Sequence, residues 1–231
     1  MHGLITGLLS VAVAQSFVLG YYALMKHHSI VSYIQKKRDY HLLSMMKRHL
    51  SQPEGFCLLL LYLTVSWHFR WLPESYYLLD TPIRWVDVTK QLLVQDALQY
   101  SCHVLEHVIP SLYKITHRHH HRFTNPTLFD SFQGSVLDTV TMVVVPLYVT
   151  SQIVHTNHRS YIAFGTLYSS WLTLIHSEFV HWWDPYLAMI GIGTASDHHV
   201  HHKLFKYNYG HVFMYWDILC GTYKHPKMVF G

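Results

Sequence analysis

The sequence predicts an all-α integral membrane protein, a helical bundle with about four to five transmembrane helices and a cytosolic, histidine-rich helical cap. Half of the 231 residues are hydrophobic and only 13% are charged, compared with about 25% in an ordinary soluble domain. Histidine occurs 22 times. The net charge of +4 is too small to indicate a nucleic-acid partner. We expect one membrane-embedded domain over residues 1–231.

The first element is an uncharged stretch over residues 3–25, long enough to cross a bilayer of about 30 Å as a helix. The "AVA" before Gln15 resembles a signal-peptide cleavage site, but a basic leading region is missing and the apolar run continues. We therefore predict an uncleaved span. Apolar runs or helical periodicity place the further spans at residues 55–72, 86–109, 136–154 and 161–175.

The distribution of lysine and arginine predicts the orientation of these spans, because cytosolic loops collect basic residues. Between the first two spans lie Lys26, Lys36, Lys37, Arg38, Lys47 and Arg48. If this loop is cytosolic, alternation places residues 114–135 and everything after His181 on the same side. Both segments are also basic, so the rule and five crossings agree. We expect residues 26–53 to form an amphipathic helix at the membrane surface.

Three groups of histidines have helical spacing, and each ends or follows a predicted span on the cytosolic side. They are "HVLEH" (His103, His107), "HRHHH" (His117, His120, His121) and "HHVHH" (His198, His201, His202). Residues three and four apart share a helix face. Each group is therefore expected to direct its imidazoles to one point.

His176, at the cytosolic end of the last span, is expected to add a ninth ligand. The eight imidazoles of the three groups already exceed the four or six positions of a single ion, so the pattern predicts two metals held mainly by nitrogen. Iron, zinc, copper and nickel all accept neutral imidazole, so the spacing alone leaves the metal open. His119 and His199 lie off the shared faces, and His181 stays open. The remaining histidines, including His155, His158 and His211, are expected to be interfacial or exposed side chains.

The order of these groups resembles the fatty acid hydroxylase/sterol desaturase superfamily over about residues 96–223, the expected catalytic core. The similar segments are "DALQYSCHVLEH", "HRHHHRFTNP" and "DHHVHHKLFKYNYG" followed by "WDILCGTY". "LIHSE" resembles most the C-5 sterol desaturase (lathosterol oxidase) branch, and "QGSVLDTV" resembles the sphingoid-base hydroxylase branch. Two departures are Val104, where the superfamily usually has arginine, and residues 130–133, where it often has H-P-x-E.

The resemblance implies a non-haem di-iron oxygenase of the endoplasmic reticulum. Such an enzyme uses O₂, with electrons from NAD(P)H through cytochrome b5 and its reductase, to hydroxylate or desaturate a membrane lipid, here most closely a sterol. Sphingoid-base or fatty-acyl hydroxylation is an alternative. The aldehyde-deformylating branch is disfavoured because its members generally carry an additional domain. A metal-binding scaffold without redox chemistry is the alternative of another class; a transporter is disfavoured because transporter sites lie near the bilayer midplane.

Carboxylates near the boxes are expected to accept the second N–H of the metal ligands. They are Asp96, Glu106, Asp197 and Asp217, the last if "YNYG" makes a turn. Asn208 and Gly210 are typical turn residues. We expect residues 186–195, about ten apolar residues, to be partly immersed in the membrane and to line the substrate entrance.

Overall fold

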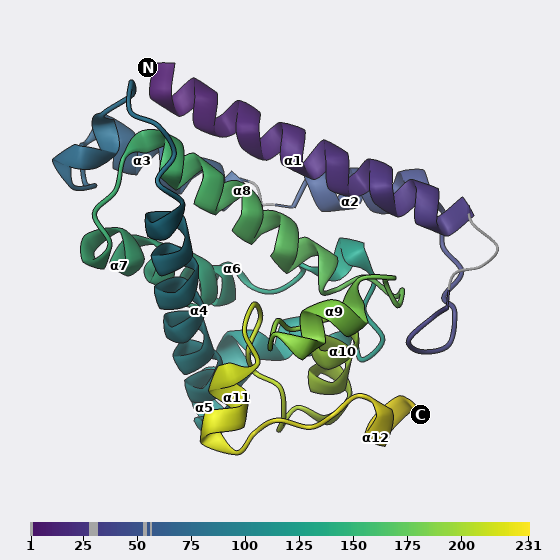
Figure 1. The fold of residues 1–231 in the computed structure, drawn as a ribbon. Coiled ribbons are helices and arrows are strands. Elements are labelled where there is room, and N and C mark those ends of the chain that lie inside the picture. The colour runs from purple at the N-terminus through teal and green to yellow at the C-terminus, as the bar shows by residue number, and fades with distance from the viewer. Residues whose placement is uncertain (1, 28–31, 53–54, 56) are drawn as a thin grey trace.

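The computed structural model describes residues 2–27, 32–52, 55 and 57–231, and within these residues all of its regular elements are helices. Extended pairing is limited there to two isolated bridges, Tyr33 with Phe179 and Ile192 with Phe213. The all-α prediction is therefore confirmed for the described chain (Figure 1).

Within the described part of the chain, two helical stretches are long and apolar enough to cross a membrane. The first is α1 (His2–His27), whose outer face exposes Ile5, Leu9, Val13 and Phe17, each at least half exposed. The second, Val136–Ile153, combines α6 (Val136–Thr139), a π-helical turn (Val140–Val144) and α7 (Val145–Ile153). Such an apolar surface on α1 indicates membrane association.

The expected count of five crossings and their direction stay predictions. Helix α3 (Leu58–His68) has 11 residues, which is about 17 Å of helix and short of the roughly 30 Å hydrocarbon layer. Helices α4 (Trp85–Val108) and α8 (His158–Leu174) have 24 and 17 residues. α8 packs against both α1 and α4 (Figure 1).

The polarity of α4 follows from what it faces. Its buried side carries Gln91, Gln95 and Gln99, and the first two bond to neighbouring elements. Gln91 Nε2 donates to the hydroxyl of Tyr76 at 3.2 Å, and Gln95 Oε1 accepts from Thr150 Oγ1 at 3.0 Å. Buried polar groups are tolerated when they are paired in this way.

The region after α4 forms a cap of short helices around the lower end of α4, as Figure 1 shows. Its elements are α5 (Pro110–Ile115), η3 (His117–Arg122), η4 (Leu128–Asp130), α9 (Asp184–Met189), α10 (Ala195–Leu204), α11 (Tyr215–Cys220) and α12 (Lys227–Phe230). Helix α10 begins with a capping box, in which Thr194 and Asp197 satisfy each other's backbone amides. Asp197 therefore caps the helix, and the expectation that it binds a box histidine is wrong.

The expected amphipathic helix over residues 26–53 is also wrong in its extent. Apart from the end of α1, its described part is helical only in α2 (Leu42–Leu50). Ile34 instead donates its amide to the Glu178 carbonyl at 2.9 Å, so this segment is tied to the chain that follows α8. Residues 28–31 and 53 lie outside the described residues. The apolar segment 186–195 turns at Gly191 (φ 69°), and Met189 before it is 84% exposed.

Candidate metal centre

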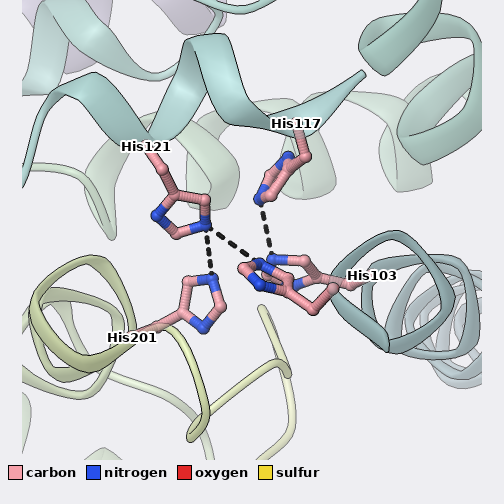
Figure 2. A group of neighbouring side chains, drawn as sticks. His103, His117, His121 and His201 are labelled. Carbon is pink, nitrogen blue, oxygen red and sulfur yellow. Dashed lines mark hydrogen bonds between the residues drawn. The ribbon is translucent and has the colours of Figure 1, made fainter. Parts of the chain in front are cut away.

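Nine histidines converge into two neighbouring groups in the cap. We call cluster 1 the group His103, His107, His117, His121 and His201, and cluster 2 the group His120, His176, His198 and His202. Within each cluster the potential ligand nitrogens all lie within 4.8 Å of one another. Figure 2 shows four imidazoles of cluster 1 pointing toward a common centre from three elements. These are the nine residues singled out in the sequence, and their role as metal ligands remains a proposal.

The clusters divide the histidine boxes in a way that the spacing did not predict. Each box was expected to converge on one point. On α10, however, His198 and His202 belong to cluster 2, whereas His201 belongs to cluster 1. An α-helix turns about 100° per residue, so positions i and i+4 are nearly in line and i+3 points aside. His120 likewise joins cluster 2 while its box partners join cluster 1.

Backbone carbonyls fix the ring orientation of four cluster histidines. The bonds run from His103 Nδ1 to Tyr209 O (2.7 Å), His201 Nδ1 to Tyr207 O (2.8 Å), His176 Nδ1 to Leu172 O (2.7 Å) and His120 Nδ1 to Gln133 O (3.2 Å). A carbonyl only accepts, so each Nδ1 must carry the proton. In a neutral ring the Nε2 of each residue is therefore a free lone pair.

Two carboxylates lie beside Nδ1 of His117. Its Nδ1 donates to Asp138 Oδ1 at 2.8 Å, and Glu106 Oε2 lies 3.5 Å from the same nitrogen. Glu106 belongs to the first box, but the ring nitrogen that it approaches is that of His117 in the second box. Asp138 was not predicted, because it follows its histidine by 21 positions and lies in an apolar stretch without a local signal.

Because the tautomers are fixed, the distances between facing Nε2 atoms show whether a metal ion fits each cluster. His103 Nε2 and His117 Nε2 lie 2.9 Å apart, and His120 Nε2 and His176 Nε2 lie 3.3 Å apart. In each pair both nitrogens present lone pairs, so no proton is available for a hydrogen bond between them. Two lone pairs at this distance repel unless a cation lies between them. The donor sets of both clusters therefore fit a metal ion that prefers neutral imidazole.

Burial keeps these imidazoles in the form that binds metals. The pKa values of His198, His201 and His202 are all held well below the ordinary value, by burial first and then by neighbouring imidazoles. Burial also lowers the pKa of His120 to about 4. A neutral imidazole is the ligand form, so at neutral pH no proton needs to leave these rings before a metal binds.

The turn of residues 207–210 supplies the carbonyls that orient cluster 1, and Asp217 holds this turn. Its carboxylate accepts from the amides of Tyr209 (2.8 Å) and Gly210 (2.7 Å). Asn208 has a φ of 54°, a left-handed conformation that asparagine tolerates. The predicted turn is present, but Asp217 bonds to its backbone amides and not to a histidine ring, so the expectation that it accepts a proton from a metal ligand is wrong.

Asp96 does not bind a histidine ring, contrary to expectation. Its carboxylate accepts from the amides of Val212 (2.8 Å) and Phe213 (2.9 Å) and from Trp216 Nε1 (3.1 Å). It therefore ties α4 to the segment that follows the turn. His211, which begins that segment and was expected at the interface, is buried, and its ring centre lies 5.0 Å from that of His103.

The histidines left open in the sequence lie outside both clusters. His181 bonds to Tyr21 Oη (2.8 Å) and Ser177 Oγ (2.7 Å), and the rings of His119 and His199 pair elsewhere, that of His199 with the Ser177 carbonyl at 3.0 Å. His119 is exposed, as predicted. His158, expected at an outer hairpin tip, is instead only 4% exposed.

Comparison with known proteins identifies the family to which the chain belongs. The family model "Fatty acid hydroxylase" matches residues 88–222, more than half of the chain. The chain belongs to this family. The matched range contains both histidine clusters and the turn that orients them. No solved structure matches the chain.

Three curated relatives illustrate the similarity of this family member. It is 47% identical to the "Alternative squalene epoxidase" of Phaeodactylum tricornutum over 97% of the chain and 67% of that relative. It is 30% identical to a "Cholesterol 25-hydroxylase-like protein" of Danio rerio over 67% of the chain and 63% of the relative. The "Lathosterol oxidase" of Rattus norvegicus is 30% identical over 66% of the chain and 51% of its own length. The chain thus spans half to two thirds of these relatives, and the predicted resemblance to C-5 sterol desaturases is confirmed.

Proposed function

We propose that the protein is a membrane oxygenase that holds one iron in each cluster and epoxidises squalene. The assignment of squalene as the substrate rests on the 47% identity to the alternative squalene epoxidase over 97% of the chain. An alignment of that extent runs across both clusters. Identity to the lathosterol oxidase is 30% over 66% of the chain, so squalene is favoured over the sterol substrate that the histidine motifs alone suggested.

The proposed reaction converts squalene, O₂, two electrons and two protons into squalene epoxide and water. Bound iron would supply the activation of O₂. We assign the electrons to NAD(P)H through cytochrome b5 and its reductase, and the site to the cytosolic face of the endoplasmic reticulum membrane. These assignments follow the family resemblance.

The chain's own contribution is a preorganised set of lone pairs in a region from which water is excluded. Eight of the nine cluster histidines are buried, and His107 is partly exposed. The carbonyls of Tyr207, Tyr209, Leu172 and Gln133 hold four of the rings in a fixed tautomer. Fixed rings favour metal binding because partners of the second ring nitrogen fix the orientation and raise the basicity of a histidine ligand.

The second candidate is C-5 sterol desaturation, favoured by the similarity to lathosterol oxidase. It would consume the same O₂ and electrons but release two waters and leave an alkene. Sphingoid-base or fatty-acyl hydroxylation is compatible with the family match. A zinc-holding scaffold without redox chemistry would use the same imidazoles.

Expression in two yeast strains tests the proposal, one lacking its own squalene epoxidase and the other lacking C-5 sterol desaturase. We expect growth without added sterol in the first strain and an unchanged sterol profile in the second. His120→Ala, expressed at the same level, is expected to abolish rescue. Rescue of the second strain alone would replace squalene by a sterol. Failure in both, with the protein present in the membrane, would contradict both candidates.

A further inference from the structure

An apolar cavity follows one face of α8 toward the metal centre. Its volume is about 90 Å³, and its wall on α8 runs from His158 through Tyr161, Gly165 and Tyr168 to Leu172. Fourteen residues separate the two ends, which is about 21 Å at a rise of roughly 1.5 Å per residue. The facing wall consists of apolar side chains of α1 and α3, such as Val11 and Leu63. The space is therefore long and narrow.

This cavity ends where a second, smaller one begins at cluster 2. The two share three lining side chains, Phe132, Val143 and Leu172. The second cavity is lined beyond them by His120 and His176, and by His117 of cluster 1. Leu172 lies one helical turn before His176 and accepts its Nδ1 proton at 2.7 Å. The apolar cavity thus leads to the imidazoles through a constriction of three side chains.

At its other side the cavity adjoins a third one, of about 320 Å³, between α1 and α3. The two share Val11, Leu59 and Leu63. Leu60, which also lines the third cavity, is 47% exposed. This side therefore offers a lateral approach from the apolar surface of the molecule.

Two glycines widen the cavity from opposite walls. A Cβ atom built at Gly165 of α8 or at Gly7 of α1 meets no other atom within 4 Å, and both glycines line the cavity. Neither has a positive φ, so no backbone conformation requires glycine there. Glycine weakens a helix interior relative to alanine. What the missing side chains provide at these positions is space.

From these observations we infer that the cavity along α8 binds the extended isoprenoid chain of the substrate. The terminal alkene passes the constriction of Phe132, Val143 and Leu172, and Gly165 sets the chain length that fits. This inference rests on the proposed function, because it takes squalene as the occupant. Moving a hydrocarbon from the bilayer into an apolar cavity has little hydrophobic driving force, since lipid tails are equally apolar. Selection must therefore come from shape, and a narrow space favours a flexible chain over fused sterol rings.

The test is a plug placed halfway along the cavity. Gly165→Leu fills the space seven residues before Leu172, which leaves about 10 Å of cavity on the metal side. Binding of tritiated squalene to the full chain in nanodiscs is compared with binding of a short isoprenoid hydrocarbon that has the same terminal alkene. We expect Gly165→Leu to weaken squalene binding at least tenfold and to leave binding of the short chain within twofold.

The matched control is Gly20→Leu. Gly20 is an exposed glycine of α1 whose added Cβ also meets nothing within 4 Å, and it does not line the cavity. It is expected to bind both chains like the wild type. Gly165→Ala, which adds one methyl group in open space and favours the helix, should fold normally and reduce squalene binding by a smaller factor. Equal squalene binding by Gly165→Leu and Gly20→Leu would overturn the inference.

The same assay separates this inference from the proposed function. Lathosterol and a linear alkane are included as further labelled lipids. If the wild type binds one of these and not squalene, squalene is refuted as the occupant. The affinity of Gly165→Leu relative to that of Gly20→Leu is then measured with the lipid that the wild type binds. A reduced ratio retains the cavity as a lipid site, whereas an unchanged ratio, or no lipid binding by the wild type, overturns it.

Discussion

Replacing Asp217 by asparagine should loosen cluster 1 although Asp217 touches none of its rings. The carboxylate is fully buried and accepts from the amides of Tyr209 and Gly210 at 2.8 and 2.7 Å. The carbonyl of Tyr209 in turn orients His103. Asparagine keeps the shape of the side chain but removes the charge and one acceptor, so one of the two amides would face an NH₂ group.

The structure sets the size of this effect. A buried amide that loses its acceptor costs about 1–3 kcal/mol, and the surviving bond loses its charge assistance. We therefore expect Asp217→Asn to lower the free energy of unfolding by about 2–4 kcal/mol. Because the turn that orients His103 becomes less fixed, metal affinity should fall by about 10–100-fold, as is typical when a partner of a metal ligand is lost.

The assay is iron content per chain after anaerobic loading and dialysis against graded chelator, together with the thermal midpoint. Asp80→Asn, at an exposed aspartate, is the matched control. The variant should lose iron at a lower chelator concentration than the wild type and the control. If Asp217→Asn retains iron as the wild type does, the argument that the turn orients the metal ligands is refuted.

Three further predictions follow from the same geometry. Fully loaded wild-type protein should contain two irons per chain, and His202→Ala should reduce this by about one as measured by mass spectrometry; stoichiometric zinc after anaerobic purification would favour the scaffold alternative. Gly210→Ala should destabilise the protein, because a Cβ there would lie 2.6 Å from the Phe213 carbonyl oxygen; an unchanged thermal midpoint would contradict this. Metal-free protein should lose stability as pH falls from 7.5 to 5.5. Burial lowers the pKa of His181 and His199 to about 4 and that of His211 to about 3. In the unfolded chain these imidazoles have a pKa of about 6.5, so below that pH the unfolded state binds more protons than the folded state. Each imidazole then costs roughly 1 kcal/mol at pH 5.5. Buried carboxyls with raised pKa values, such as Asp184 at about 6, oppose this, and each one offsets at most part of the summed cost of the imidazoles. A thermal midpoint that does not decrease would refute this sign.

The residues that gather in the site could be predicted from sequence because imidazole pairs at helical spacing are a local signal. Eight of the nine histidines, the long apolar α1 and the turn at Asn208 were predicted from neighbours within a few positions, and His176 from its place at the end of the last predicted span. The helical span over residues 136–154 was also found, although the π-helical turn inside it was not. In each case short-range periodicity or turn chemistry carried the information.

What the sequence did not predict depends on contacts between distant segments. Asp138 pairs with His117 across 21 positions, and the division of α10 between two clusters requires the position of η3 beside it. Residues 86–109 were predicted as a span, but polar side chains of α4 there face partners such as Tyr76 and Thr150. The cavity along α8 is formed by side chains from at least three helices, so no local pattern could indicate it.

The most direct test of the proposed function is isotope incorporation by the purified, iron-loaded protein. Squalene in nanodiscs is incubated with the protein, cytochrome b5, its reductase, NADPH and ¹⁸O₂, and the products are analysed by mass spectrometry. We predict squalene epoxide with one ¹⁸O atom per molecule, and none from His120→Ala. Epoxide that carries oxygen only from water, or unreacted squalene beside a desaturated or hydroxylated sterol in parallel incubations, would contradict it.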